Sequence, residues 1–360
     1  MRERIGILTG GGDCPGLNTV IRAVVKCATK QGWDTIGFLD GFEGLLEPLR
    51  YRALAYKEMD ALLFVGGTVL GTSNKGRFAA KTGHGQSNRV PTEILDQAKA
   101  NFQKLGLRAL VVVGGDGSLS SAQQLFEHGV PIVGVPKTID NDLEATALTF
   151  GFDSAVACAT DALDRLRTTA QSHERVMVLE VMGRYAGWIA VTAGISGGGD
   201  VILIPEIPFR YESVCAKVTD REREGKRFTL VVAAEGAREQ GSGYVTAGDA
   251  GTNREARLGG IGAVVAAEIQ KRTGKETRVC VLGHLQRGGA PTSFDRLLCT
   301  RFGARAVQLI AERQYGYMVA LHPPDTAAVR ISEAVGRLRA VPPNGDMVRT
   351  ARALGISFGD

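Results

Sequence analysis

Short apolar runs that end in clusters of glycine recur along this chain of 360 residues. The runs are continuous rather than alternating, which is typical of strands buried on both faces of a sheet. Several are followed by apolar residues at helical spacing. The pattern predicts an α/β protein with mainly parallel sheets, in which the glycine-rich turns can bind ligands. Strands are expected at Arg4–Thr9, Ala109–Val113, Pro131–Val135, Val176–Val181, Val201–Ile207, Thr229–Gly236 and Thr277–Gly283, and helices within Gly16–Gly32, Leu119–Gly129, Ala155–Arg167 and Ile189–Gly194.

Composition narrows the class of protein. Apolar residues make up 44% of the chain, enough for a sizeable core, which excludes a disordered chain. The six cysteines are scattered without a C-x-x-C pair, which argues against a zinc site and against a disulfide scaffold. No apolar run is long enough to cross a membrane or to form a signal peptide, so a cytoplasmic enzyme is expected.

The formal net charge of +5 has two interpretations, an ordinary solvated surface or an anionic partner. Aromatic residues are only 6% of the chain and no dense Lys/Arg run occurs, so nucleic acid is not an expected partner. Small phosphorylated ligands fit this charge better.

The stretch TGGGDCPGLN (Thr9–Asn18) follows the first expected strand. Glycines allow the backbone to approach a phosphate closely, and the N-terminus of the next helix supplies N–H groups. The stretch is neither a Walker A motif nor G-x-G-x-x-G, and no acidic residue follows at the usual ribose-reading place, where Asp40 is the nearest candidate. A tight turn without ligand is the alternative.

The stretch GGDGS (Gly114–Ser118) places Asp116 at the end of a strand, with Gly117 leaving space beside it. One carboxylate next to phosphates suits Mg²⁺, which one or two carboxylates and phosphate oxygens usually hold. The alternative is that Asp116 only caps the following helix.

The stretch VPKTIDND ends in two aspartates, Asp140 and Asp142. In an extended turn the two side chains alternate, so one can serve metal-bound phosphate while the other accepts a proton from an attacking hydroxyl. Lys137 can offset the negative charge that gathers during phosphoryl transfer. Asx-turn preference alone could also explain the DND sequence.

Arginines lie at the ends of later strands. Arg175 and Arg184 flank one strand, and Arg278, His284 and Arg287 accompany another. A guanidinium group binds phosphate through two parallel hydrogen bonds. An isolated arginine is more often a surface ion-pair partner, but glycines beside Arg184 and Arg287 leave room for a ligand.

Together these residues make the chain resemble the phosphofructokinases, which phosphorylate fructose 6-phosphate at its 1-hydroxyl. GGDG alone also occurs in other kinases, but the matching set follows the family's order over roughly residues 5–305. The matching stretches are GILTGGGDCPGLN, GGTVLGTS, VVGGDGS, PKTIDND, SHERVMVLEVMGRYAGW, AAEG and TRVCVLGHLQRGG.

The resemblance implies two similar Rossmann-like three-layer lobes with mainly parallel sheets and an active site in the cleft between them. The donor-binding lobe would comprise 1–151 and about 286–336, and the fructose 6-phosphate lobe 152–285 and the C-terminal segment 337–360. A homo-oligomer is also implied, a tetramer or dimer of dimers, in which Arg175 and Arg278 reach the substrate site of a neighbouring subunit.

The resemblance further implies a role for each matching residue. Asp140 would be the general base, and Asp116 would hold Mg²⁺, with Asp142 nearby to orient metal and phosphate. Thr138, Arg184 and Gly12 would act on the transferring phosphoryl group. The implied donor-binding residues are Gly11, Gly12, Arg77, Asp116, Gly117, Ser118 and Lys137. The implied substrate-binding residues are Thr138, Asp140, Arg175, Met182, Gly183, Arg184, Glu235, Arg278, His284 and Arg287.

The phosphoryl donor is less clear from the resemblance. Pyrophosphate-using members typically carry Asp where Gly117 stands and Lys where Lys137 stands, so this chain is mixed. A carboxylate at 117 would repel the α-phosphate of a nucleotide, and Gly117 leaves room for it. The combination resembles some ATP-using plant and protist members, which favours ATP, with pyrophosphate as the alternative.

A second departure from the bacterial ATP enzymes follows GGTVLGTS. Where they carry a phosphate-bridging arginine this chain has Asn74 and Lys75, with Arg77 beyond. Arg22, Lys26 and Arg167 stand where basic effector-site residues would lie, so allosteric control is expected. The polar segments Lys81–Thr92 and Glu239–Gly260 are expected to be surface loops. A non-catalytic phosphosugar-sensing subunit is a further alternative, as is a dinucleotide-binding oxidoreductase, which the missing G-x-G-x-x-G disfavours.

Overall fold

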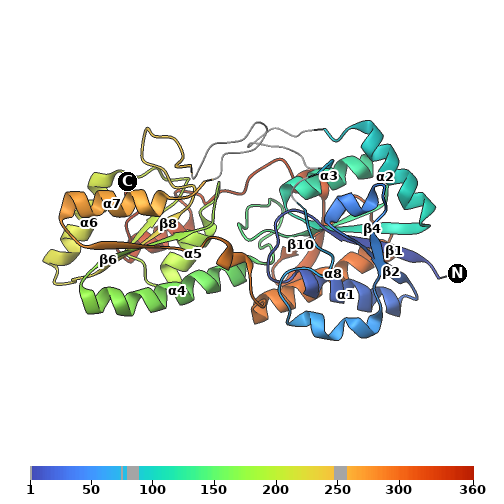
Figure 1. The fold of residues 1–360 in the computed structure, drawn as a ribbon, viewed down its shortest axis with the longest axis horizontal. Coiled ribbons are helices and arrows are strands. Elements are labelled where there is room, and N and C mark those ends of the chain that lie inside the picture. The colour runs from blue at the N-terminus through green and yellow to red at the C-terminus, as the bar shows by residue number, and fades with distance from the viewer. Residues whose placement is uncertain (1, 74–75, 79–88, 247–257) are drawn as a thin grey trace. The chain divides into compact units, whose positions relative to one another are not determined.

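The computed structural model describes residues 2–73, 76–78, 89–246 and 258–360 (Figure 1). The chain forms two compact units. The first unit comprises Met1–Ile139, Leu143–Asp153 and Arg287–Leu338, and the second comprises Asp140–Asp142, Ser154–Gln286 and Arg339–Asp360. The chain therefore crosses between units several times. Which ligand each unit binds stays a prediction.

Within the described residues, the first unit contains a sheet of seven strands in the order β11-β10-β5-β4-β1-β2-β3. Only the outer pairs β2–β3 and β10–β11 are antiparallel. Helices α1 and α8 cover one face, and α2 and α3 cover the other (Figure 1). The strands are β1 Arg4–Thr9, β2 Asp34–Phe38, β3 Tyr51–Ala53, β4 Leu107–Gly114, β5 Ile132–Pro136, β10 Tyr317–His322 and β11 Asp325–Arg330. The helices are α1 Leu17–Lys30, α2 Thr92–Lys104, α3 Asp116–Glu127, α8 Ser293–Ala311 and α9 Ile331–Ala334, with short 3₁₀ helices η1 Gly41–Leu45, η2 Tyr56–Glu58 and η3 Asp60–Leu63.

In the part of the second unit that the structure describes, four parallel strands lie in the order β7-β8-β6-β9. Helices α6 and α7 lie over one face, and α4 and α5 over the other (Figure 1). The strands are β6 Val176–Val181, β7 Val201–Leu203, β8 Thr229–Ala234 and β9 Thr277–Val281. The helices are α4 Phe152–His173, α5 Trp188–Ser196, α6 Tyr211–Arg223, α7 Ile261–Thr273 and α10 Asp346–Ala353, with the 3₁₀ helix η4 Gly283–Arg287.

The expected α/β class with mainly parallel sheets is confirmed. The central strands β1, β4, β6 and β8 are buried almost throughout, as continuous apolar runs predict. Full burial of each Val, Leu or Ile side chain stabilises the fold by roughly 1.5–3 kcal/mol. These cores fix the strand ends, from which the functional loops leave.

Several element boundaries differ from expectation, including that of α4, which runs over Phe152–His173 instead of Ala155–Arg167. The strand expected at Val201–Ile207 ends at Leu203, and Pro205 shortly after it has no N–H with which to continue a ladder. The helix expected from Leu119 begins at Asp116. The segment Lys81–Thr92 lies mostly outside the described residues, as does the centre of Glu239–Gly260. No helix among the described residues has both the length and the apolar character needed to cross a membrane.

Candidate active site

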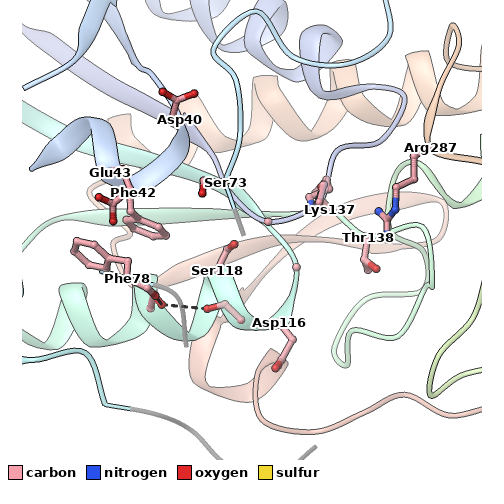
Figure 2. A pocket seen from close by; sticks show the side chains of 15 residues that line it. Asp40, Phe42, Glu43, Ser73, Phe78, Asp116, Ser118, Lys137, Thr138 and Arg287 are labelled. Atoms are coloured by element: carbon pink, nitrogen blue, oxygen red, sulfur yellow. Dashed lines mark hydrogen bonds between the residues drawn. The ribbon is translucent and has the colours of Figure 1, made fainter. Parts of the chain in front are cut away.

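A cavity of about 240 Å³ opens at the carboxyl edge of the first unit's sheet (Figure 2). The parallel strands β1, β4 and β5 are neighbours, so the loops that follow them meet at the same edge. Eight residues expected at the site line this cavity. They are Gly11, Gly12, Asp116, Gly117, Ser118, Lys137, Thr138 and Arg287.

The loop after β1 has a backbone that glycine permits. Gly11 has φ +79°, in the left-handed region that side chains rarely adopt. Its N–H donates to the Ser73 carbonyl at 3.2 Å, and its own carbonyl accepts from the Thr72 hydroxyl at 2.6 Å. A Cβ on Gly12 would lie 2.9 Å from the Arg287 guanidinium, whose Nη1 donates to the Asp13 carbonyl at 3.0 Å. Close approach of this cation therefore needs glycine at 12.

The N-terminus of α3 also lines the cavity. Gly115 occupies the N-cap position without a side-chain cap, so the alternative that Asp116 caps the helix is wrong. Asp116 is the first helical residue, and its Oδ1 accepts the N–H of Gly336 at 2.8 Å. The first turn of a helix presents unpaired N–H groups and a positive dipole end, which favours an anion beside it.

Neither the backbone conformation nor the packing of neighbouring atoms requires a glycine at position 117. Its φ is not in the left-handed region, and a Cβ there would meet no atom within 4 Å. Gly114 differs, because a Cβ on it would lie 2.3 Å from the Cβ of Ser118. The space beside Gly117 therefore belongs to the cavity, and a side chain there would occupy it without disturbing the fold.

Lys137 joins two of these loops. Its side chain is buried, and Nζ donates to the Gly12 carbonyl, while its backbone N–H donates to the Gly114 carbonyl at 2.9 Å. The next residue, Thr138, accepts the Thr149 hydroxyl on its carbonyl at 2.7 Å. A buried ammonium group thus lies against the glycine-rich loop, where it raises the local positive potential.

The opposite wall of the cavity was not anticipated from the sequence. Phe42 and Phe78 stack with ring centroids 4.7 Å apart, and Asp40, Glu43 and Ser73 also line the cavity (Figure 2). These residues lie far apart in the chain, and only Asp40 had been noted. In the sequence, only the position of the Asp40–Leu45 stretch shortly after a strand could have indicated that it lies near the cavity.

Arg77, expected to bind the donor, does not line the cavity. Its Nε donates to Glu43 Oε2 at 3.1 Å, and its backbone N–H donates to Glu43 Oε1 at 2.6 Å. Glu43 therefore holds the guanidinium through an ion pair. Asn74 and Lys75 lie outside the described residues.

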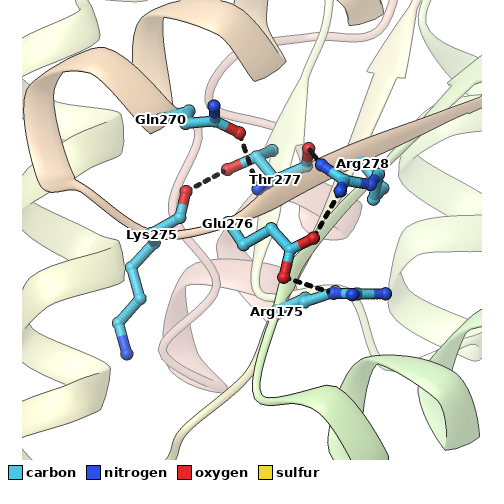
Figure 3. Close-up of polar contacts among 6 residues, drawn as sticks. All are labelled: Arg175, Gln270, Lys275, Glu276, Thr277 and Arg278. Carbon is cyan, nitrogen blue, oxygen red and sulfur yellow. Dashed lines mark hydrogen bonds and ion pairs between the residues drawn. The ribbon is translucent and has the colours of Figure 1, made fainter.

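In the second unit, Arg175 and Arg278 share one carboxylate (Figure 3). Arg175 Nε donates to Glu276 Oε2 at 2.7 Å, and Arg278 Nη2 donates to Glu276 Oε1. Arg175 precedes β6, Glu276 precedes β9 and Arg278 is the second residue of β9. Both arginines thus lie at the edge where the strands begin.

The other expected sugar-binding residues of this unit follow the strand ends. Met182, Gly183 and Arg184 follow β6, Glu235 follows β8 and His284 follows β9. Gly183 has φ +133°, and a Cβ on Gly236 would lie 1.9 Å from the Arg184 carbonyl, so both glycines allow a close backbone approach. A six-residue strand spans about 20 Å at roughly 3.3 Å per residue. Arg175, directly before β6, is therefore separated from Met182–Arg184 by the length of this strand.

The turn at Asp140–Asp142 is not extended, contrary to expectation. Asn141 between them has φ +51° and is 2% exposed. Left-handed backbone is uncommon outside glycine, although asparagine tolerates it best. The two aspartates are therefore separated by one residue of left-handed backbone rather than by simple strand alternation. The Asp142 carbonyl accepts the N–H of Arg339 at 2.9 Å.

The thiol of Cys14, inside the glycine-rich loop, is not a nucleophile. Burial raises its pKa to about 12 against the weaker opposing effect of Lys137. The side chain is fully buried. It therefore stays a protonated thiol near neutral pH and acts as a small apolar group.

The expected effector-site residues lie in different places. Arg167 lines a cavity of about 640 Å³ in the second unit, together with the ion pair of Arg221 and Asp200 at 2.7 Å. Lys26, in the first unit, pairs with Asp60 and lies 4.8 Å from the ring of Tyr56.

The fold and the cavity together define an α/β protein with a glycine-lined cavity at the ends of parallel strands, where a helix N-terminus and a buried ammonium group suit an anion. The phosphofructokinase family model matches residues 4–310. The chain is 53% identical over 361 residues to the ATP-dependent 6-phosphofructokinase of Chloroflexus aurantiacus, covering 100% of this chain and 98% of that protein. It is 47% identical over 342 residues to the pyrophosphate–fructose 6-phosphate 1-phosphotransferase of Amycolatopsis methanolica, covering 94% and 96%.

Among solved structures, the chain resembles Pichia pastoris phosphofructokinase in the T-state, with a TM-score of 0.82 and 30% identity. The match covers 93% of this chain and 35% of that longer chain. The chain belongs to the phosphofructokinase family, and it is an enzyme.

Proposed function

We propose that the chain transfers the γ-phosphoryl group of ATP to the 1-hydroxyl of fructose 6-phosphate. The products are fructose 1,6-bisphosphate and ADP, and the reaction is a step of glycolysis. The observation that carries the choice of ATP is the open space beside Gly117, next to the N-terminus of α3. The 53% identity to an ATP-dependent enzyme over the whole chain supports it.

The cavity of the first unit is the proposed donor site. The loop at Gly11–Gly12 and the first turn of α3 provide backbone N–H groups for phosphates. The stacked rings of Phe42 and Phe78 offer an apolar surface that suits a nucleotide base and that pyrophosphate does not need. Pyrophosphate remains the second candidate donor, because a relative at 47% identity uses it by name and because Lys137 suits either donor.

Asp116 is the proposed Mg²⁺ ligand. Its carboxylate lines the cavity and has one oxygen bonded to the Gly336 N–H. No group of three His, Cys, Asp or Glu suited to a metal occurs among the described residues. A single carboxylate fits an ion that the donor phosphates hold in large part, and such an ion neutralises charge on the phosphate oxygens.

Asp140 is the proposed general base, which accepts the proton of the 1-hydroxyl as the phosphoryl group transfers. Asp142 orients metal and phosphate, and Thr138 contacts the transferring group. Lys137, Arg184 and the Gly12 backbone offset the charge that develops on the phosphoryl oxygens.

The fructose 6-phosphate site is proposed to use residues from two subunits. Met182, Gly183, Arg184, Glu235 and His284 follow the strand ends, and Arg287 completes the set. Arg175 and Arg278 lie at the opposite edge of the same sheet, so they serve the site of a neighbouring subunit. This separation supports a homo-oligomer, for which we propose a tetramer.

Allosteric control and a cytoplasmic location are proposed as well. Arg167, Lys226 and Arg227 line the second unit's cavity and suit an anionic effector. Arg22 and Lys26, in the first unit, are also proposed to bind an effector.

One assay tests the function: fructose 6-phosphate and Mg²⁺ with ATP or with pyrophosphate, measured side by side. We expect fructose 1,6-bisphosphate with ATP. Turnover with pyrophosphate but not with ATP would refute the proposal that ATP is the phosphoryl donor. Turnover with neither, combined with measurable fructose 6-phosphate binding, would indicate a phosphosugar-sensing subunit instead.

A further inference from the structure

Residues Arg339–Val341, here called the strap, lead from the first unit into the C-terminal part of the second. Arg339 uses both of its backbone groups. Its N–H donates to the Asp142 carbonyl at 2.9 Å, and its carbonyl accepts the indole N–H of Trp188 at 2.8 Å. One residue therefore connects the Asp140–Asp142 turn to the first residue of α5.

A second contact fixes the strap to the same end of α5. The Val341 N–H donates to Glu206 Oε1 at 2.8 Å, and Glu206 also accepts the N–H of Gly187, the N-cap residue of α5, at 3.0 Å. A Cβ on Gly187 would lie 2.4 Å from Ile204, so the start of α5 is packed tightly against the residues after β7. The strap is thus attached to a rigid support.

The turn that the strap contacts has a backbone that needs such support. Asn141 is left-handed and buried, and a strained backbone of this kind persists only where its surroundings fix it. The Arg339 N–H bonds the residue directly after Asn141. The proposed general base Asp140 is the residue directly before it.

We propose that Trp188 is a positioning residue, which holds the Asp140–Asp142 turn in its catalytic geometry through the strap. This inference rests on the proposed function. Trp188 touches neither substrate in this account; it acts through Arg339 and Asp142. A small displacement of a catalytic group lowers the rate of the chemical step more than it changes the binding of substrates.

Trp188→Phe tests the proposal, because it removes the indole N–H and keeps an aromatic ring for Arg339, whose guanidinium lies 4.8 Å from the ring centroid. The chain supplies a matched control. Its only other tryptophan, Trp33, has the Arg108 guanidinium 4.8 Å from its ring and lies in the first unit. Trp33→Phe makes the same chemical change away from the strap.

Three readouts are measured on both variants: kcat and KM for both substrates, the melting temperature, and hydrogen exchange of the peptide that contains Arg339 and Val341. For Trp188→Phe we expect kcat to fall about tenfold, less than the 10² that a 1 Å misplacement costs, with KM values within about twofold. Exchange of the strap amides should rise about tenfold. Trp33→Phe should change neither kcat nor strap exchange.

Faster strap exchange with unchanged kcat would overturn the positioning role. So would unchanged strap exchange, or a fall in kcat that Trp33→Phe reproduces with a similar loss of melting temperature. Failure of the proposed function is a distinct result, because the unmodified protein would then show no phosphofructokinase turnover. Glu206→Ala, which removes the other anchor, should reproduce the fall in kcat if Trp188→Phe folds poorly.

Discussion

The two units arrange their expected functional residues differently. In the first unit, residues from three neighbouring strand ends line one cavity, from Gly11 to Thr138. In the second unit, the expected residues are divided between the two edges of one sheet, with Arg175 and Arg278 at one edge and Glu235 and His284 at the other. The first arrangement suits a ligand bound within one chain, and the second is the basis of the proposal that a neighbouring chain completes the site.

The charged side chains that hydrogen-bond the loops also differ in sign between the two units. In the first unit the buried ammonium of Lys137 bonds the glycine-rich loop, where donor phosphates are proposed to bind. In the second unit the carboxylate of Glu206 joins α5 to the strap. A buried cation beside a polyanion site contributes to binding, while a buried carboxylate away from it contributes to structure. This difference underlies the proposal that the donor binds to the first unit, and the following variants test that proposal.

Asp140→Ser should have the largest effect. If the first unit binds the donor by itself, loss of the proposed general base should lower kcat by at least ~10² and leave nucleotide binding intact. Steady-state kinetics and calorimetric titration of a non-hydrolysable ATP analogue would measure the two quantities. Near-normal turnover would disprove the base, and lost nucleotide binding would show that the donor site is not confined to the first unit.

Gly117→Asp should lower kcat/KM for ATP by at least about tenfold, because a carboxylate would occupy the open space and repel phosphate. The melting temperature should stay unchanged, since the new Cβ meets no atom within 4 Å. Gly117→Ala is the matched control, which adds the Cβ without charge and should retain most ATP activity. If the KM for ATP is unchanged in Gly117→Asp, the space beside Gly117 does not explain the choice of ATP as the donor.

Features formed by residues close together in the sequence were predicted, whereas contacts between residues far apart in the sequence were not. The boundaries of β1 and β6 were predicted correctly, because each is a short, mainly apolar run with a glycine within two residues of its end. The stacked wall of Phe42 and Phe78 was not, because only the folded chain brings these rings together. Likewise, the ion pair between Glu43 and Arg77 could not be read from either residue's neighbours.

The left-handed turn at Asn141 shows a different limit. The DND sequence was recognised as favourable for an Asx turn, yet an extended conformation was expected for the functional interpretation. The left-handed backbone of Asn141 agrees with the general preference of asparagine, and the contact at the residue after it comes from Arg339, almost two hundred residues later in the chain.

Arg175→Ala should raise KM for fructose 6-phosphate by about tenfold through loss of a phosphate-binding guanidinium, with less effect on KM for ATP. Mixing it with Asp140→Ser gives the sharper result. If Arg175 serves a neighbouring subunit, some sites of a mixed oligomer contain both native residues, and activity should return above that of either variant alone. If activity does not recover in refolded mixtures, Arg175 does not serve the site of a neighbouring subunit.

Arg165→Ala is the control for that experiment. Arg165 is an exposed arginine of the same unit that pairs with Asp161, and it has no proposed role. Its KM should not change, because an exposed ion pair contributes little.

Glu206→Gln should have the smallest effect, on stability and its pH dependence. Burial raises the pKa of the Glu206 carboxyl against the opposing hydrogen bonds from Val341 and Gly187. A carboxyl group with a raised pKa in the folded state binds more protons there than in the unfolded chain. Its stabilisation is therefore complete below the unfolded pKa, about 4.3, and is lost as pH rises through the folded pKa. Urea unfolding of both proteins is measured at pH 4 and pH 7.5. The free energy of unfolding of the native protein should fall relative to that of Glu206→Gln as the pH rises. If the difference between the two proteins stays constant with pH, the Glu206 carboxyl group ionises as easily in the fold as in water, and the prediction is wrong.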